Sequence, residues 1–370
     1  MLLADPIAGL RSPSGALMSV YVDRPDPGGL GALLTDLLRP VREEADTRPR
    51  TVQKSVRSDV KRIHDLADRL ETEAAPAYAI FASDADGLFM LEPLTHSVPS
   101  TSVLGPRPYL RPLRAAPRPF RTGVIVADKA QARVFVSSNG LVEEVGEPLD
   151  ANIGKTNYGG FSGYAEHNVR GHADEATAKM WKKASARLLA AHQDRPVDYL
   201  VIGGHEETVE EVGRTLHPYL SQLYRTNFPA TPSTISLASI RAELADLNRE
   251  VRARRQSAIA GRVCDTAWSG GNAVLGLAAS LEACNAQAVE TLVVAGEFTR
   301  PGSICNECGH LSRAEEICPV CGAGMFFVAD VVAYAMDSAV VARGKVHQID
   351  VASPLDNEGV GALTRFSFHG

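Results

Sequence analysis

The chain alternates short apolar runs with longer stretches in which apolar residues recur every three or four positions. In the first hundred residues, Met18–Val22 predicts a buried strand and Leu30–Arg42 predicts a helix. A second helix is predicted from one apolar face, formed by Val52, Val56, Val60, Ile63, Ala67 and Leu70. Tyr78–Ala82 and Gly87–Leu91 then predict a hairpin. We therefore expect a small α/β unit at the start of the chain.

The middle of the chain resumes this alternation after a proline-rich break. Six prolines lie between Pro99 and Pro119, and because proline suits neither helix interiors nor central strands, we expect a domain boundary there. Strands are predicted at Gly123–Ala127, Ala132–Ser137 and Tyr199–Ile202. A long polar loop over 151–171 is expected to precede a helix with one apolar face, formed by Ala173, Ala176, Met180, Trp181, Ala184 and Leu188.

The last third predicts a layered α/β domain. A helix carries Leu237, Ile240, Leu244, Leu247 and Val251 in register. A helix over Ala273–Cys284 and strands at Val289–Ala295 and Lys345–Val351 follow it. The chain is thus expected to divide into an N-terminal domain at 1–118, a middle domain at 119–232 and a C-terminal domain at 233–370.

Composition narrows the class of protein. The 370 residues are 45 % hydrophobic and 22 % charged, as in an ordinary globular protein. No apolar run approaches the roughly 18–20 residues that span a bilayer, and the first residues lack a basic segment, so we expect a cytoplasmic protein with no membrane partner.

Four cysteines near the C-terminus form two Cys-x-x-Cys-Gly segments, Cys305–Gly309 and Cys318–Gly322. This spacing favours one closed, structural Zn²⁺ site with four thiolate ligands, Cys305, Cys308, Cys318 and Cys321, over a redox motif or a disulfide pair. A closed site leaves no position for water or substrate, so the metal is expected to hold a minidomain at about 300–325 and to catalyse nothing. Cys264 and Cys284 are expected to be buried apolar residues.

Basic residues gather locally although the net charge is −6. Lys54, Arg57 and Lys61 belong to one cluster on the second predicted helix, and five arginines lie among the prolines: Arg107, Arg111, Arg114, Arg118 and Arg121. Local basic patches suit contact with structured RNA. On charge alone, a solvated helix face and a stiff linker are equally good interpretations.

The C-terminal third resembles the third domain of archaeal and eukaryotic class-1 peptide-chain release factors and of Pelota. The resemblance rests on the phrase Leu281–Val294, on cysteines at the position of the family's minidomain, and on the closing Gly-rich phrase Glu358–Phe366. It implies a three-domain α/β architecture with the zinc minidomain inserted in the third domain.

The middle domain is similar to the family in layout but departs from it at the hydrolytic loop. The family has Gly-Gly-Gln before a long helix, whereas here Gly159-Gly160 is followed by Phe161. Phenylalanine cannot position a water by a side-chain hydrogen bond, so no catalytic residue is assigned. The segment that would reach the peptidyl-transferase centre is Tyr158, Gly159, Gly160, Phe161, Ser162, Gly163 and Tyr164. Stacking of its aromatic residues on RNA bases and a flexible loop are both considered.

The expected function follows from these departures. The chain resembles the Balon group of bacterial ribosome-hibernation factors, which implies occupancy of the ribosomal A site, contact with its rRNA and with the peptidyl-transferase centre, and a translational GTPase such as EF-Tu as partner. His167, Arg170, His172, Lys182 and Lys183, after the loop, are expected to contact phosphates. The main alternative is a ribosome-rescue peptidyl-tRNA hydrolase. An RNA-cleaving enzyme and a non-ribosomal zinc-stabilised binding module are further alternatives.

Overall fold

A computed structural model of the chain describes residues 7–23, 29–72, 75–115, 120–138, 140–151 and 164–367; over 164–171 it describes the helix but not the side chains. The chain forms two compact units, one from residues 1–116 together with 253–370 and one from residues 117–252. The architecture is mixed α/β, as predicted. The division into three domains at 118 and 232 stays a prediction.

The first part of the chain forms a four-stranded antiparallel sheet with strand order β3-β2-β1-β4. The predicted strand and hairpin are confirmed. The strands are β1 (Leu17–Asp23), β2 (Ala77–Ser83), β3 (Leu88–Leu94) and β4 (Thr101–Gly105). The helices are α2 (Leu30–Asp46), α3 (Arg50–His64), α4 (Ala67–Thr72) and α5 (Arg111–Ala115).

One expectation for this part was wrong. The second helix is two helices, because α3 ends at His64 and α4 begins at Ala67, so Leu70 reaches the same core from a separate helix. The proline-rich break contains an edge strand, β4, and a short helix, α5, with Pro112 in its first turn. Proline is tolerated at both kinds of position, at the start of a helix and beside a sheet edge.

The unit at 117–252 is built on a six-stranded mixed sheet, in which β5 pairs with β9 in parallel and with β6 in antiparallel orientation. Its strands are β5 (Arg121–Ala127), β6 (Gln131–Ser138), β7 (Leu141–Glu144), β8 (Leu149–Asp150), β9 (Tyr199–Gly203) and β10 (Tyr224–Phe228). Its helices are α6 (Tyr164–Asp194), α7 (Glu206–Thr215), α8 (Pro218–Ser221) and the first half of α9 (Leu237–Trp268).

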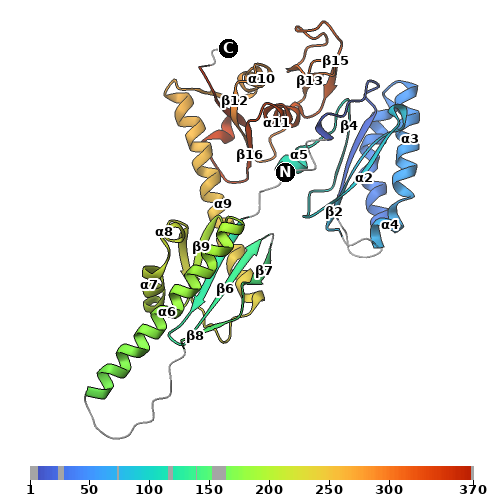
Figure 1. Ribbon diagram of the computed structural model, residues 1–370. Coiled ribbons are helices and arrows are strands. Elements are labelled where there is room, and N and C mark those ends of the chain that lie inside the picture. The colour runs from blue at the N-terminus through green and yellow to red at the C-terminus, as the bar shows by residue number, and fades with distance from the viewer. Residues whose placement is uncertain are drawn as a thin grey trace. The chain divides into compact units, whose positions relative to one another are not determined.

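Alternating residues of this sheet pack into two hydrophobic cores. Ile125 of β5 faces the core that contains Trp181 and Leu188 of α6, whereas Val124 faces the core that contains Ile240 of α9. Helix α6 crosses the sheet and continues beyond it (Figure 1). The apolar face predicted for this helix is confirmed at Met180, Trp181, Ala184 and Leu188, which are buried. The expected loop over 151–171 is wrong at its end, because α6 already begins at Tyr164; residues 152–163 lie outside the described residues.

The last part of the chain contains a four-stranded sheet, order β11-β17-β12-β16, and a separate three-stranded sheet, order β14-β13-β15. The strands are β11 (Ala273–Leu275), β12 (Val289–Ala295), β13 (Gly302–Cys305), β14 (Leu311–Ser312), β15 (Met325–Val328), β16 (Lys345–Ile349) and β17 (Val360–Thr364). The helices are α10 (Leu277–Asn285) and α11 (Val331–Val341).

The helix expected over Ala273–Cys284 is instead a strand followed by a helix. Gly276 separates β11 from α10 with a φ of +79°, a conformation that few other residues adopt. Cys264 and Cys284 are buried, as predicted. Among the described residues, no helix is long and apolar enough to cross a bilayer.

Candidate metal centre and RNA-contact surfaces

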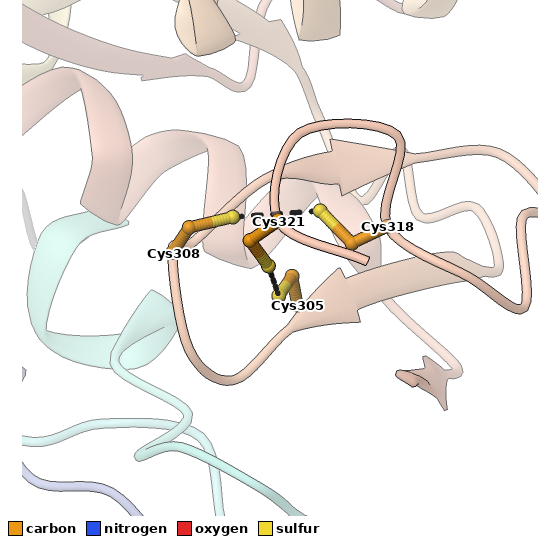
Figure 2. A group of neighbouring side chains, drawn as sticks. All are labelled: Cys305, Cys308, Cys318 and Cys321. Atoms are coloured by element: carbon orange, nitrogen blue, oxygen red, sulfur yellow. Dashed lines mark hydrogen bonds between the residues drawn. The ribbon is translucent and has the colours of Figure 1, made fainter. Parts of the chain in front are cut away.

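The four cysteine sulfurs converge at one end of the three-stranded sheet. All four Sγ atoms lie within 4.8 Å of one another, with Cys305 Sγ 3.4 Å from Cys321 Sγ and Cys308 Sγ 3.4 Å from Cys318 Sγ. Figure 2 shows the four side chains pointing toward a common centre. Four sulfurs at about 2.3 Å from a tetrahedral zinc would lie about 3.8 Å apart, so the arrangement fits a four-thiolate metal site. A disulfide needs sulfurs about 2.05 Å apart, which this geometry does not have.

Each cysteine pair lies on a tight turn closed by a glycine. Gly309 N donates to Cys305 O over 3.0 Å, and Gly322 N donates to Cys318 O over 2.9 Å. Both glycines have positive φ, +85° and +75°, a conformation that glycine adopts without strain. Burial acts to raise the pKa of Cys305, but hydrogen bonds outweigh it and lower the pKa to about 7: first that of the Cys308 backbone N–H, then those of the Cys321 and Cys308 thiols, and last that of the Glu307 backbone N–H. These amides favour the thiolate that a metal requires.

The donor set limits what a bound metal could do. Within the described parts of the chain, these cysteines are the only group of three or more His, Cys, Asp or Glu side chains placed to hold an ion. Four thiolates around one ion leave no open position for a substrate or a reactive water. The four cysteines could therefore hold a metal whose role is structural.

The first knuckle, Cys305–Gly309, is contacted by residues from the start of the chain. Arg107 Nη2 donates to Cys305 O (2.9 Å) and Asn306 O (3.0 Å), and Arg11 Nη1 donates to Asn306 O (2.8 Å). Asn306 Nδ2 donates to Ser12 O (3.0 Å). Burial, and next the neighbouring Arg11, lower the pKa of Arg107 to about 10. Sequence reasoning missed this set, because its members lie almost 200 residues or more from the cysteines along the chain.

Three arginines of the cluster among the prolines make internal contacts and do not form an exposed basic patch. Arg111 pairs with Asp330 (2.9 Å) and Arg114 with Asp337 (3.0 Å), and both arginine side chains are nearly buried. Together with Arg107, they bind the segment after β4 to the C-terminal part of the chain. For these three residues, RNA contact and a solvated linker are both wrong, because their guanidinium groups are occupied within the protein.

Helix α3 presents the predicted cations to solvent. Lys54, Arg57 and Lys61 are exposed, whereas Val52, Val56 and Val60 face the core. Arg57 Nη2 lies 3.7 Å from Asp46 Oδ1, but both side chains are about 70 % exposed, so this pair neutralises little of the charge. The face is available for a polyanion, which stays a prediction.

The predicted residues after the Gly-Gly pair are only partly described. Tyr158, Gly159, Gly160, Phe161, Ser162 and Gly163 lie outside the described residues, and Tyr164, His167 and Arg170 lie on α6 in the stretch without described side chains. His172, Lys182 and Lys183 are exposed on the same helix. Lys182 and Lys183 directly follow the buried Trp181, so they extend from the helix face that points away from the sheet.

Comparison with known proteins agrees with the sequence prediction. Residues 108–255 match the family model of bacterial archaeo-eukaryotic release factor family 10. The resemblance to release factors predicted from the sequence is thereby confirmed. No curated protein matches the chain.

Several solved structures are similar to the chain at low identity. The archaeal translation termination factor aRF1 is 14 % identical over 98 % of this chain and 96 % of its own, with a TM-score of 0.25. Ribosome-bound archaeal Pelota, described together with ABCE1, is 18 % identical over 78 % of this chain and 77 % of its own, with a TM-score of 0.43. Pelota of Archaeoglobus fulgidus is 16 % identical over 80 % of each chain, with a TM-score of 0.38.

Proposed function

We propose that this chain binds in the ribosomal A site and reaches the peptidyl-transferase centre without hydrolysing peptidyl-tRNA, as a hibernation factor of the Balon type. The observation that carries the proposal is Phe161, which follows Gly159-Gly160 inside the region matched by the release-factor family model. In class-1 release factors the corresponding residue is a glutamine.

Peptide release requires a water held against the ester bond of peptidyl-tRNA. A glutamine side chain can both donate and accept hydrogen bonds to such a water, whereas phenylalanine can do neither. Loss of one positioned donor typically lowers a rate by about 10²–10³-fold. The loop nevertheless keeps the glycines that permit close approach to RNA, and Phe161 adds a flat apolar face suited to stacking on a base.

Two groups of exposed cations supply binding surface for rRNA. Lys54, Arg57 and Lys61 extend from α3, and His172, Lys182 and Lys183 extend from α6. Among the described residues, neither group includes His, Cys, Asp or Glu side chains placed to hold a metal ion, and we assign both groups to phosphate contact. The proposed partners are the rRNA of the A site and a translational GTPase, EF-Tu in bacteria.

Ribosome sedimentation from cells in stationary phase tests the proposal. The full-length chain is expected to co-sediment with ribosomes and to leave them at high salt. A chain that stays at the top of the gradient under all salt conditions would defeat both this function and the rescue alternative, and would favour a non-ribosomal binding module.

The second candidate is a ribosome-rescue peptidyl-tRNA hydrolase, which the release-factor family match favours. A peptidyl-release assay on stalled ribosome complexes separates the two candidates. Release that depends on residues 158–164 would establish the hydrolase and overturn the hibernation role. Intact rRNA and tRNA after long incubation would exclude an RNA-cleaving activity.

A further inference from the structure

The two cysteine knuckles differ in what surrounds them. The first, Cys305–Gly309, receives hydrogen bonds from Arg11 and Arg107 and donates one to Ser12. At the second, a Cβ added to Gly322 would meet no atom within 4 Å. A Cβ added to Gly309 would lie 3.4 Å from Arg107 Nη1, so a guanidinium lies close against the first turn only.

A second contact joins the minidomain to the same segment of the first part of the chain. Gly15, which has a φ of +70°, leaves no room for a side chain, because a Cβ there would lie 2.7 Å from Phe326 Cε1 of β15. Ser12, whose carbonyl accepts from Asn306, also has its N–H bonded to Pro106 O over 2.8 Å. Residues 11–15 and 106–107 are thus bound to one another and to the minidomain.

Within the described parts of the chain, neither Arg11 nor Arg107 forms an ion pair with a carboxylate. Asp337, an acidic residue whose charge acts on Arg107, is already paired with Arg114. Both guanidinium groups instead converge on backbone carbonyls of the knuckle. Four thiolates around one divalent ion carry a net charge of about −2, which places negative charge beside these two arginines.

We propose that the metal-loaded first knuckle is the docking site that fixes residues 11–15 and Arg107 to the C-terminal part of the chain. We call the contacts that join residues 11–15 and Arg107 to the first knuckle the clamp. Arg107 is its positioning residue, because it contacts the carbonyl oxygens of both Cys305 and Asn306. Metal binding and closure of the clamp are then coupled, and the coupling is reciprocal. The factor by which bound metal favours the closed clamp equals the factor by which the closed clamp raises the affinity for the metal. This role is independent of the ribosome.

Metal affinity of the full-length chain tests one direction of the coupling. Competition with a chromogenic chelator compares the wild type, Arg107→Ala, Arg107→Lys and a control, Arg313→Ala, which removes an exposed arginine of the same minidomain. Removing a side chain that hydrogen bonds to a metal-ligating residue typically lowers metal affinity 10–100-fold, so Arg107→Ala is expected to bind at least about tenfold more weakly. Arg107→Lys keeps the positive charge but loses the forked hydrogen bonds of the guanidinium group. Its metal affinity should therefore lie between those of the wild type and Arg107→Ala. Arg313→Ala should match the wild type.

Hydrogen exchange tests the other direction. Removing the metal from the wild type is expected to speed exchange at the amides of Ser12, Gly15 and Ala16, all of which are hydrogen bonded in the clamp segment. Amides of β2 serve as the internal control and should not change. The proposal is overturned if the clamp amides keep their protection without metal, or if Arg107→Ala and Arg313→Ala bind metal equally well.

One further result would reassign the arginines. Arg11 and Arg107 also line a cavity of about 220 Å³ together with Gln287, Cys308, Ser338 and Asp337. Unchanged metal affinity in Arg107→Ala, combined with thermal stabilisation by inorganic phosphate of the wild type but not of the variant, would overturn the clamp in favour of an anion site.

Discussion

Arg111 Nη1 lies 2.9 Å from Asp330 Oδ2, and the two side chains are only 5 % and 10 % exposed. The same carboxylate oxygen accepts a hydrogen bond from Tyr109 over 3.0 Å, while Oδ1 accepts from Val332 N and Ala333 N at the start of α11. The Asp330 side chain therefore both caps α11 and binds the segment after β4. This pair joins residues 219 positions apart in the sequence.

Arg111→Ala is expected to lower the free energy of unfolding by about 3–5 kcal/mol, because it leaves the Asp330 carboxylate buried without its counter-charge. Urea unfolding monitored by circular dichroism measures the loss. Arg313→Ala, at an exposed position, is the control and should change stability by no more than about 0.5 kcal/mol. Equal stability of the two variants would show that the buried pair does not hold the two parts of the chain together.

Because of Asp59, we expect the stability of the first part of the chain to depend on pH. Its side chain is 2 % exposed, and burial raises its pKa from 3.8 to about 6. Between these pH values the unfolded chain releases the proton that the folded chain keeps, so stability falls as pH rises through this window and is level above it. The full effect is up to about 3 kcal/mol.

Asp59→Asn isolates this effect, because an asparagine oxygen can still accept the 3.0 Å hydrogen bond from Asp84 N. Urea unfolding at several pH values from 4 to 7 measures the free energy of unfolding of the wild type and of the variant. As pH rises, the free energy of unfolding of the wild type should fall relative to that of the variant. A difference that is constant over this range contradicts the raised pKa.

Local patterns predicted most strands and the cluster of four cysteines, because the information lies within a few residues. The apolar run at Gly123–Ala127 and the repeated Cys-x-x-Cys-Gly spacing are of this kind. The strand that begins at Ala273 was harder to predict from the sequence, because β11 is three residues long and is defined by pairing with β17 almost 90 residues later. Apolar residues alone cannot distinguish such a strand from the first turn of a helix.

Arg107, Arg111 and Arg114 show where sequence reasoning fails for charged residues. Charged side chains are usually exposed, so a cluster of them predicts a surface. These three instead contact backbone carbonyls and carboxylates about 190–220 residues away, and only the tertiary structure brings those partners together. On α3 the basic side chains are exposed, and the Asp46 carboxylate near Arg57 is itself exposed, so the solvated basic face is confirmed while RNA contact stays a prediction.

Metal analysis is expected to give one Zn²⁺ per chain, held by four thiolates. Cobalt substitution should produce the ligand-to-metal charge-transfer absorption of a tetrahedral tetrathiolate site, and Cys318→Ser should weaken it. Cys264→Ser, at a buried cysteine outside the cluster, should leave the metal content unchanged. A stoichiometry near zero in protein purified without chelator would contradict a structural metal.

Ribosome binding is expected to weaken steeply with salt, because it depends on the neutralisation of phosphates by basic side chains. Replacing both Lys182 and Lys183 with alanine should weaken binding and reduce the slope of log affinity against log salt by about one for each phosphate that is no longer neutralised. Lys179→Ala is the matched control on the same helix, because Lys179 already pairs with Glu175 at 2.8 Å. Equal salt slopes for the wild type and the double variant would place these lysines outside the interface.

Phe161 gives the sharpest separation of the two ribosomal functions. In a peptidyl-release assay the wild type and Phe161→Ala should both stay at the background rate, since neither side chain can position water. Phe161→Gln restores the Gly-Gly-Gln sequence and is expected to release peptide faster than the wild type, by up to about 10²-fold, the size of one positioned hydrogen-bonding group. All three proteins should bind ribosomes, because the exposed cations of α3 and α6 are unchanged. Release by the wild type at a rate that Phe161→Ala reduces would instead make Phe161 part of a working hydrolytic loop and overturn the hibernation role.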